Sequence, residues 1–132
     1  MSTKVFVNFP VTNLEVSTAF YEKLGFKKNP MFSDDMASCM VWDDNFYIML
    51  LTHQRYQFFI GDKAIADTKN VSGVLAAFTL PTAEAVKEFG EKASQNGGQS
   101  IHLDNGIPEE MMYGLEILDP DGNCLEPVWM AM

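Results

Sequence analysis

Few residues in this chain have side chains suited to catalysis. The two cysteines, Cys39 and Cys124, could act as nucleophiles, but a reactive thiol needs its pKa lowered by a helix start or a neighbouring base. Neither cysteine has such a neighbour in the sequence, so we expect both to be buried and inert. The two histidines, His53 and His102, belong to no motif, and we expect them to lie at the surface or to be satisfied locally.

The charge balance excludes several classes of partner. Eighteen acidic and nine basic residues give a net charge of −9, which repels nucleic acid and anionic lipid surfaces. Two cysteines are too few for a disulfide scaffold, and no signal-peptide pattern opens the chain. The longest apolar runs, such as residues 46–51, are far shorter than a membrane span. We therefore expect a cytoplasmic protein with no nucleic-acid or membrane partner.

An internal repeat organises the elements that must position any site. The segment FPVTNLEVSTAFYEK at residues 9–23 returns 69 residues later as FTLPTAEAVKEFGEK at residues 78–92. A unit of this kind cannot bury both its strand and its helix alone, so the two copies must share a core. We predict a single domain over residues 1–132, with one module at residues 3–52, a helical connector at 53–72 and a second module at 73–131.

Each module is predicted to contain a strand, a helix and then three strands. Thr12 and Glu15 have capping-box spacing, which places a helix at residues 13–24, and Gly25 ends it. The turn signal at residues 119–122 predicts a hairpin that closes the second module. The predicted strands are residues 4–11, 27–33, 37–42 and 46–51, then 74–80, 99–103, 111–118 and 123–130, and the second helix is residues 82–96.

Two motifs carry a resemblance to a known superfamily. Residues 13–26 read Asn-Leu-Glu-x-Ser-x-x-Phe-Tyr-x-x-Leu-Gly-Phe, and residues 119–126 read Asp-Pro-Asp-Gly-x-x-x-Glu. With the repeated module, this pattern resembles the vicinal oxygen chelate superfamily of glyoxalase I, the bleomycin-resistance proteins and the extradiol dioxygenases. The resemblance implies an α+β fold of two βαβββ modules that form a curved mixed sheet around a cleft, with the helices on the outer faces.

In metal-dependent members of the superfamily, the ligands lie on the first and last strands of each module. The resemblance places those positions at Phe6, Met49, Leu75 and Glu126. Only Glu126 suits a hard or borderline cation, because phenylalanine and leucine have no lone pairs and a thioether is a soft ligand. We therefore expect no cofactor, and a divalent metal held by a rearranged ligand set is the alternative. The side chains available to such a set are His53, His102, Asn8, Glu116 and Glu126.

Glu126 is accordingly the strongest candidate in the chain for a functional residue. Antiparallel pairing around residues 119–122 predicts that it lies opposite Leu115, with Tyr113 on its face and Glu116 pointing away. Glu126 could anchor a ligand amine, amide or hydroxyl, or act as a base with a raised pKa. It could equally be a hydrated carboxylate or one paired with Asn8. Asn8 and Tyr113 are its expected companions at the site, although hydrogen bonds from these side chains to backbone groups would also explain their presence.

Two functions of different classes follow from these residues and from the resemblance. The first is a small-molecule-binding protein of the bleomycin-resistance kind, with an organic ligand in an apolar cleft lined by Phe6, Asn8, Met49, Leu75, Tyr113 and Glu126. The second is a metal-dependent lyase or dioxygenase of the glyoxalase I or extradiol kind. Whether the protein is an enzyme stays open at this point. The resemblance also implies a homodimer.

Overall fold

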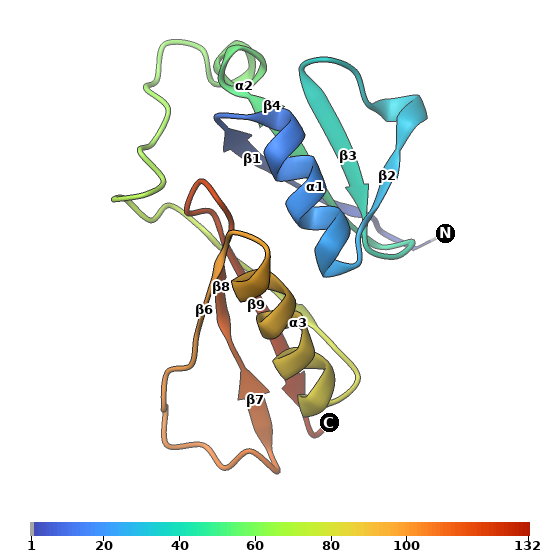
Figure 1. The fold of residues 1–132 in the computed structure, drawn as a ribbon, viewed down its shortest axis with the longest axis vertical. Coiled ribbons are helices and arrows are strands. Elements are labelled where there is room, and N and C mark those ends of the chain that lie inside the picture. Colours follow the sequence, from blue (N-terminus) through green and yellow to red (C-terminus); the bar gives the residue numbers. More distant parts are fainter. Residues whose placement is uncertain (1) are drawn as a thin grey trace. The chain divides into compact units, whose positions relative to one another are not determined.

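The computed structural model describes residues 2–132 and divides the chain into two compact units, Met1–Asp67 and Thr68–Met132. Each unit contains a mixed β-sheet with an α-helix packed against it, so the predicted α+β class is confirmed (Figure 1). Within residues 2–132, no helix has the length and apolar character needed to cross a membrane.

The first unit is a four-stranded sheet in the order β1-β4-β3-β2. Strand β1 runs parallel to β4, and the other pairs are antiparallel. Helix α1 packs on β3 and β4. The elements are β1 (Val5–Val11), α1 (Leu14–Leu24), β2 (Lys27–Asn29), the 3-10 turn η1 (Pro30–Phe32), β3 (Ala37–Val41), β4 (Phe46–Thr52) and α2 (His53–Ile60).

The alternation of side chains along β1 separates a buried face from an open one. Phe9 and Val11 are buried in the core with Ile48 and Leu50 of β4. Phe6 and Asn8, whose side chains point to the opposite face of the sheet, are exposed. Successive residues of a strand point to opposite faces, so this is the pattern expected for a sheet with a helix on one side. Val5, at the start of the strand, is exposed.

Two local predictions in this unit were wrong. Asn13, not Thr12, caps helix α1, because its side-chain oxygen accepts a hydrogen bond from the Val16 amide at 3.1 Å. The strand predicted for residues 27–33 ends at Asn29, since Pro30 cannot donate to a sheet ladder and instead starts the turn η1.

The second unit is a sheet in the order β5-β9-β8-β6, with β7 also paired to β9. Strand β5 runs parallel to β9, and helix α3 covers one face, where Phe78 and Phe89 contact each other edge to face at 5.5 Å. The strand predicted for residues 111–118 is two short strands separated at Leu115. The elements are β5 (Leu75–Thr79), α3 (Ala83–Gln95), β6 (Gln99–Ile101), β7 (Met112–Gly114), β8 (Glu116–Leu118) and β9 (Cys124–Met130).

The turn between β8 and β9 sets the register of the closing hairpin. The Asp119 amide donates to the Asn123 carbonyl at 2.9 Å, so these two residues form the last pair and three residues make the loop. One Asp119 carboxylate oxygen accepts from the amides of Asp121 and Asn123, each at 2.9 Å. Gly122 has φ +86°, the left-handed conformation that a three-residue hairpin loop requires.

Replacing Gly122 by alanine should destabilise the protein more than the same change at another left-handed glycine. At Gly122 an added Cβ would lie 2.4 Å from the Thr68 carbonyl oxygen, whereas Gly97, with φ +98°, has nothing within 4 Å. We expect Gly97→Ala to cost about 1–2 kcal/mol of strain, and Gly122→Ala to cost about 1–3 kcal/mol more from the clash. Urea denaturation measures both, and equal losses would contradict the account of this turn.

Candidate functional site

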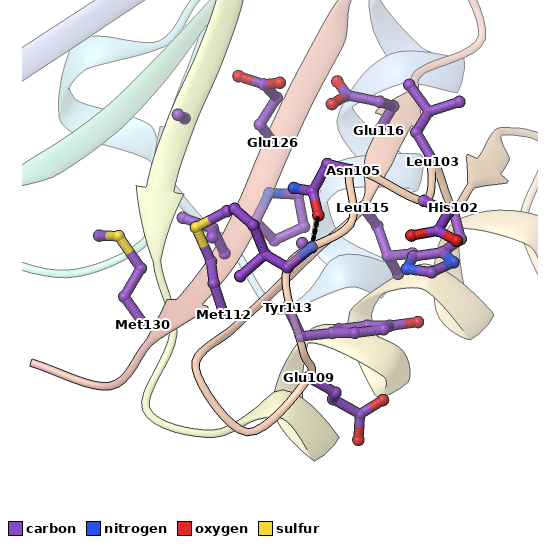
Figure 2. A pocket seen from close by; sticks show the side chains of 16 residues that line it. His102, Leu103, Asn105, Glu109, Met112, Tyr113, Leu115, Glu116, Glu126 and Met130 are labelled. Carbon is purple, nitrogen blue, oxygen red and sulfur yellow. Dashed lines mark hydrogen bonds between the residues drawn. The ribbon is translucent and has the colours of Figure 1, made fainter.

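The closing hairpin brings two glutamates together. Ile117 lies opposite Leu125 and Leu118 opposite Cys124, so the next pair along the ladder is Glu116 with Glu126. The pairing of Gly114 with Val128 on β7 gives the same register. Directly opposed residues share a face of a sheet, and Figure 2 shows both carboxyl groups projecting to the same side.

The prediction that Glu126 lies opposite Leu115 was therefore wrong. It assumed a four-residue turn at residues 119–122, whereas the observed turn closes at Asn123 and contains one residue more. Because side chains alternate, a shift of one residue exchanges the two faces of a strand. Glu116 accordingly joins Glu126, and Leu115 and Ile117 are buried on the α3 side.

Tyr113 also lies on the other face of its strand, contrary to the prediction. Its cross-strand partner is Trp129, not a residue of the Glu126 face. The phenol ring stacks on the His102 imidazole, with centroids 4.9 Å apart, and the Lys87 ammonium of α3 lies 5.1 Å from its centroid. Tyr113 is thus held by α3 and by the segment that follows β6.

A cavity of about 560 Å³ lies beside β7. Strand β6 ends at Ile101, opposite Glu116, and does not continue alongside β7, whose ladder partner is β9. Residues 102–111 bow outward around this gap and return into β7 (Figures 1 and 2). Because the cavity sits where the sheet has lost a neighbouring strand, residues from both faces reach it, Tyr113 as well as Glu126.

The cavity has apolar walls and a small set of polar groups. Met112, Val128 and Met130 come from β7 and β9, which places two of the methionines in the wall of the cavity. Ala77, the parallel partner of Glu126 on β5, adds a small side chain. The polar and titratable groups that line the cavity are His102, Asp104, Asn105, Glu109, Tyr113, Glu116 and Glu126.

The pKa of Glu126 is raised from its ordinary value of 4.5 to about 7. The largest cause is its hydrogen bond with the Glu116 carboxyl group, followed by burial and by the negative charge of Glu116. Two carboxyl groups in contact cannot both ionise cheaply, so one keeps its proton to a higher pH. At neutral pH, Glu126 therefore exchanges a proton readily, which is the property of a general acid or base.

Cys124 supports the pair from the same strand as Glu126. Its thiol donates to the Glu116 carboxylate, with Sγ 3.3 Å from Oε2. Burial and this neighbouring carboxylate raise the pKa of Cys124 to about 12. Burial also raises the pKa of Cys39, and both cysteines are buried and free. The prediction of buried thiols is confirmed, and the Cys124 thiol acts as a hydrogen-bond donor.

The remaining predicted site residues occupy both units. In the first unit, Phe6 stacks on Tyr47 with ring centroids 4.3 Å apart, and Asn8 is the ladder partner of Met49 on the same face. In the second unit, Leu75 starts β5 and is 54% exposed, on the same side of the sheet as Glu126.

The positions that the resemblance assigns to metal ligands do not fit a divalent ion. An aromatic ring, a thioether and an aliphatic chain hold three of the four, and the fourth, Glu126, is already hydrogen-bonded to Glu116. The nearby thiol of Cys124 would have to lose a proton whose pKa is about 12. Among residues 2–132, no group of three or more His, Cys, Asp or Glu side chains is placed to hold a metal ion.

Comparison with solved structures gives the fold of the chain. A glyoxalase/bleomycin resistance protein/dioxygenase family enzyme from Burkholderia phytofirmans PsJN matches with a TM-score of 0.77 and 18% identity over 98% of this chain and 100% of that one. A hypothetical protein from S. aureus matches with a TM-score of 0.74 and 22% identity over 98% and 95%. The fosfomycin resistance protein FosX from Listeria monocytogenes matches with 0.68 and 15% over 100% and 94%.

Neither a protein-family model nor a curated protein matches the sequence. At 15–22% identity the likeness to solved structures establishes the architecture. The glyoxalase-like fold that the two sequence motifs implied is thereby confirmed.

Because the pKa of Glu126 is raised, its contribution to the free energy of unfolding should decrease as pH rises. The folded state binds this proton with a pKa of about 7 and the unfolded chain with 4.5, so the stabilisation is complete below pH 4.5 and is lost as pH rises through 7. We expect the free energy of unfolding of the wild type, minus that of Glu126→Gln, to fall between about pH 5 and pH 8. Urea denaturation across this range measures the difference. A constant or rising difference would contradict the shared proton.

Proposed function

We propose that this chain uses its glyoxalase-like fold to bind a small organic molecule that carries a positive charge, in the cavity beside β7. The observation that carries the proposal is the Glu116–Glu126 pair on the wall of a cavity that combines apolar side chains with a small set of polar ones. A cavity of about 560 Å³ falls in the range of small-molecule sites, which combine apolar walls with a few convergent polar groups.

The positive charge proposed for the ligand follows from the repulsion between the Glu116 and Glu126 carboxylates. Like charges placed directly across two strands destabilise a sheet, and the proton on Glu126 relieves that repulsion. A ligand ammonium or guanidinium group placed between the two carboxylates would relieve it as well, and would form charge-assisted hydrogen bonds. The net charge of −9 also favours the approach of cations.

The apolar walls of the cavity favour a ligand whose charged group is attached to an apolar body. Met112 and Met130 offer flexible, polarisable surface that adapts to the shape of a ligand. Val128 and Ala77 lie beside Glu126 on the same face and leave it no further charged neighbour on β5 or β9. An organic cation with an apolar body matches this surface better than a bare inorganic ion, which would leave the apolar walls uncovered.

A second candidate function is acid–base catalysis in the same cavity. The pKa of about 7 at Glu126 favours it, because a general acid or base works best when its pKa lies near the working pH. This reaction needs no metal. The metal-dependent lyase or dioxygenase is not proposed, because the side chains at the ligand positions do not suit a divalent cation.

Assembly and location stay predictions. A homodimer is proposed from the resemblance and is tested by sedimentation of the purified protein. A cytoplasmic location is proposed from the free thiols and the net charge and is tested by cell fractionation.

Phenethylamine and 2-phenylethanol test the proposal as a matched pair of probes, one cationic and one neutral. We expect the amine to bind about 10–100-fold more tightly at pH 8, the range of a hydrogen bond to a charged group. Its affinity should fall as pH drops below 7, because the proton of Glu126 then competes with the ammonium group. Isothermal titration calorimetry measures both quantities.

Substitutions at the pair identify the site. Glu126→Gln and Glu116→Gln should each remove most of the preference for the amine, whereas Glu88→Gln, an exposed glutamate of α3, should leave it unchanged. Equal affinities for the two probes, or an amine affinity unaffected by Glu126→Gln, would overturn the proposal.

A further inference from the structure

Residues 102–111, here called the strap, form one side of the cavity. They leave the end of β6, contain no helix or strand, and return to the sheet at β7. Six of the residues that line the cavity belong to the strap: His102, Leu103, Asp104, Asn105, Ile107 and Glu109. Short internal hydrogen bonds, from the Gly106 amide to Asp104 and from the Ile107 amide to Asn105, shape it locally.

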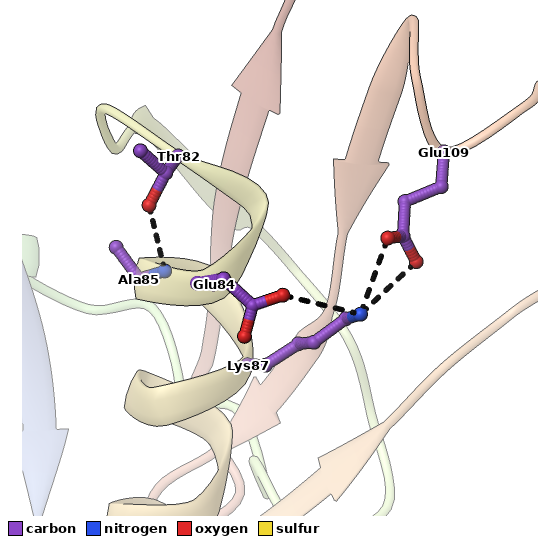
Figure 3. A network of polar contacts seen from close by, with 5 residues as sticks. All are labelled: Thr82, Glu84, Ala85, Lys87 and Glu109. Carbon is purple, nitrogen blue, oxygen red and sulfur yellow. Dashed lines mark hydrogen bonds and ion pairs between the residues drawn. The ribbon is translucent and has the colours of Figure 1, made fainter.

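The strap is fastened to the rest of its unit at two points. At its neck, the ring of His102 stacks on that of Tyr113, where the chain re-enters the sheet. Near its end, Glu109 forms an ion pair with Lys87 of α3, whose Nζ lies 3.1 Å from one carboxylate oxygen and 3.2 Å from the other. Figure 3 shows this contact, with Glu84 of α3 as a second acidic neighbour of Lys87, 3.8 Å away.

One partner of the ion pair lies outside the cavity that the strap borders, and the other lines it. Lys87 belongs to α3, on the face of the sheet opposite Glu126, and it does not line the cavity, whereas Glu109 does. The hydrogen bond with Glu109 raises the pKa of Lys87, so the lysine stays charged throughout the neutral range. Lys87 therefore acts on the position of the strap through Glu109 and does not itself line the cavity.

The apolar side chains of the strap are incompletely buried. Leu103 is 64% exposed and Ile107 is 43% exposed, although both line the cavity. Apolar surface on one side of a cavity is covered only when something fills it or when the wall closes down. These two side chains give the strap a reason to move inward over an apolar ligand.

We propose that the strap is a lid over the cavity and that the Lys87–Glu109 ion pair is its latch. Lys87 is a positioning residue in this proposal, acting through Glu109. An exposed ion pair contributes little free energy and breaks often, so it suits a lid that must open repeatedly. The stacked rings of His102 and Tyr113 form the fixed end about which the strap moves.

Amide hydrogen exchange of the protein without any ligand tests the latch. The amides of Met111 and Met112 both donate to the Pro108 carbonyl, in the turn that contains Glu109, and report directly on opening of this end. We expect Lys87→Gln and Glu109→Gln each to raise their exchange rates by about twofold to fivefold, the range of an exposed ion pair. The double variant should add nothing to either single change.

Two further variants separate a latch from a general loss of charge. Lys92→Gln removes an exposed lysine from the same helix and should leave these amides unchanged. The exchanged pair, Lys87→Glu with Glu109→Lys, should restore slow exchange. Unchanged rates in both single variants, or rates that add in the double variant, would overturn the proposal whether or not the cavity binds a cation.

Discussion

The contact between the Glu116 and Glu126 carboxyl groups is the interaction on which the site depends. It exists only because the hairpin of β8 and β9 is closed by a turn that ends at Asn123, with Gly122 in a left-handed conformation. The same register puts Leu115 and Ile117 under α3 and frees the opposite face for the two acids. The register of β8 and β9 therefore both buries the core side chains and brings the two carboxyl groups into contact.

A sheet defect provides the space beside this pair. Strand β6 stops opposite Glu116, so β7 has no ladder partner on that side and the strap bridges the gap. An intact strand there would have filled the cavity with backbone. The early end of β6 thus leaves a pocket next to the Glu116–Glu126 pair. It also leaves the strap as the wall of that pocket which we propose can move.

Much of the architecture could be predicted from the sequence, because the repeat and its apolar periodicity report on which faces are buried. Phe9, recurring as Phe78, marked the first strand of each module correctly, and Gly25 marked the end of the first helix. The site was less predictable. Glu126 was found, but Glu116 was set aside and Tyr113 was placed on the wrong face, because both assignments depended on counting turn residues. Whether a turn closes at Gly122 or at Asn123 is decided by hydrogen bonds of Asp119, which leave no trace in hydrophobic periodicity.

The titration of Glu126 is the most direct test of its contact with Glu116. Carbon-detected nuclear magnetic resonance of its side-chain carboxyl, across the acid and neutral range, should give a midpoint near pH 7 in the wild type. In Glu116→Gln the midpoint should fall from about 7 toward the ordinary value of 4.5, because an amide carries no negative charge and can donate a hydrogen bond to the Glu126 carboxylate, while the raising effect of burial remains. A wild-type midpoint near 4.5, or one that Glu116→Gln leaves unchanged, would contradict the shared proton and the cation site built on it.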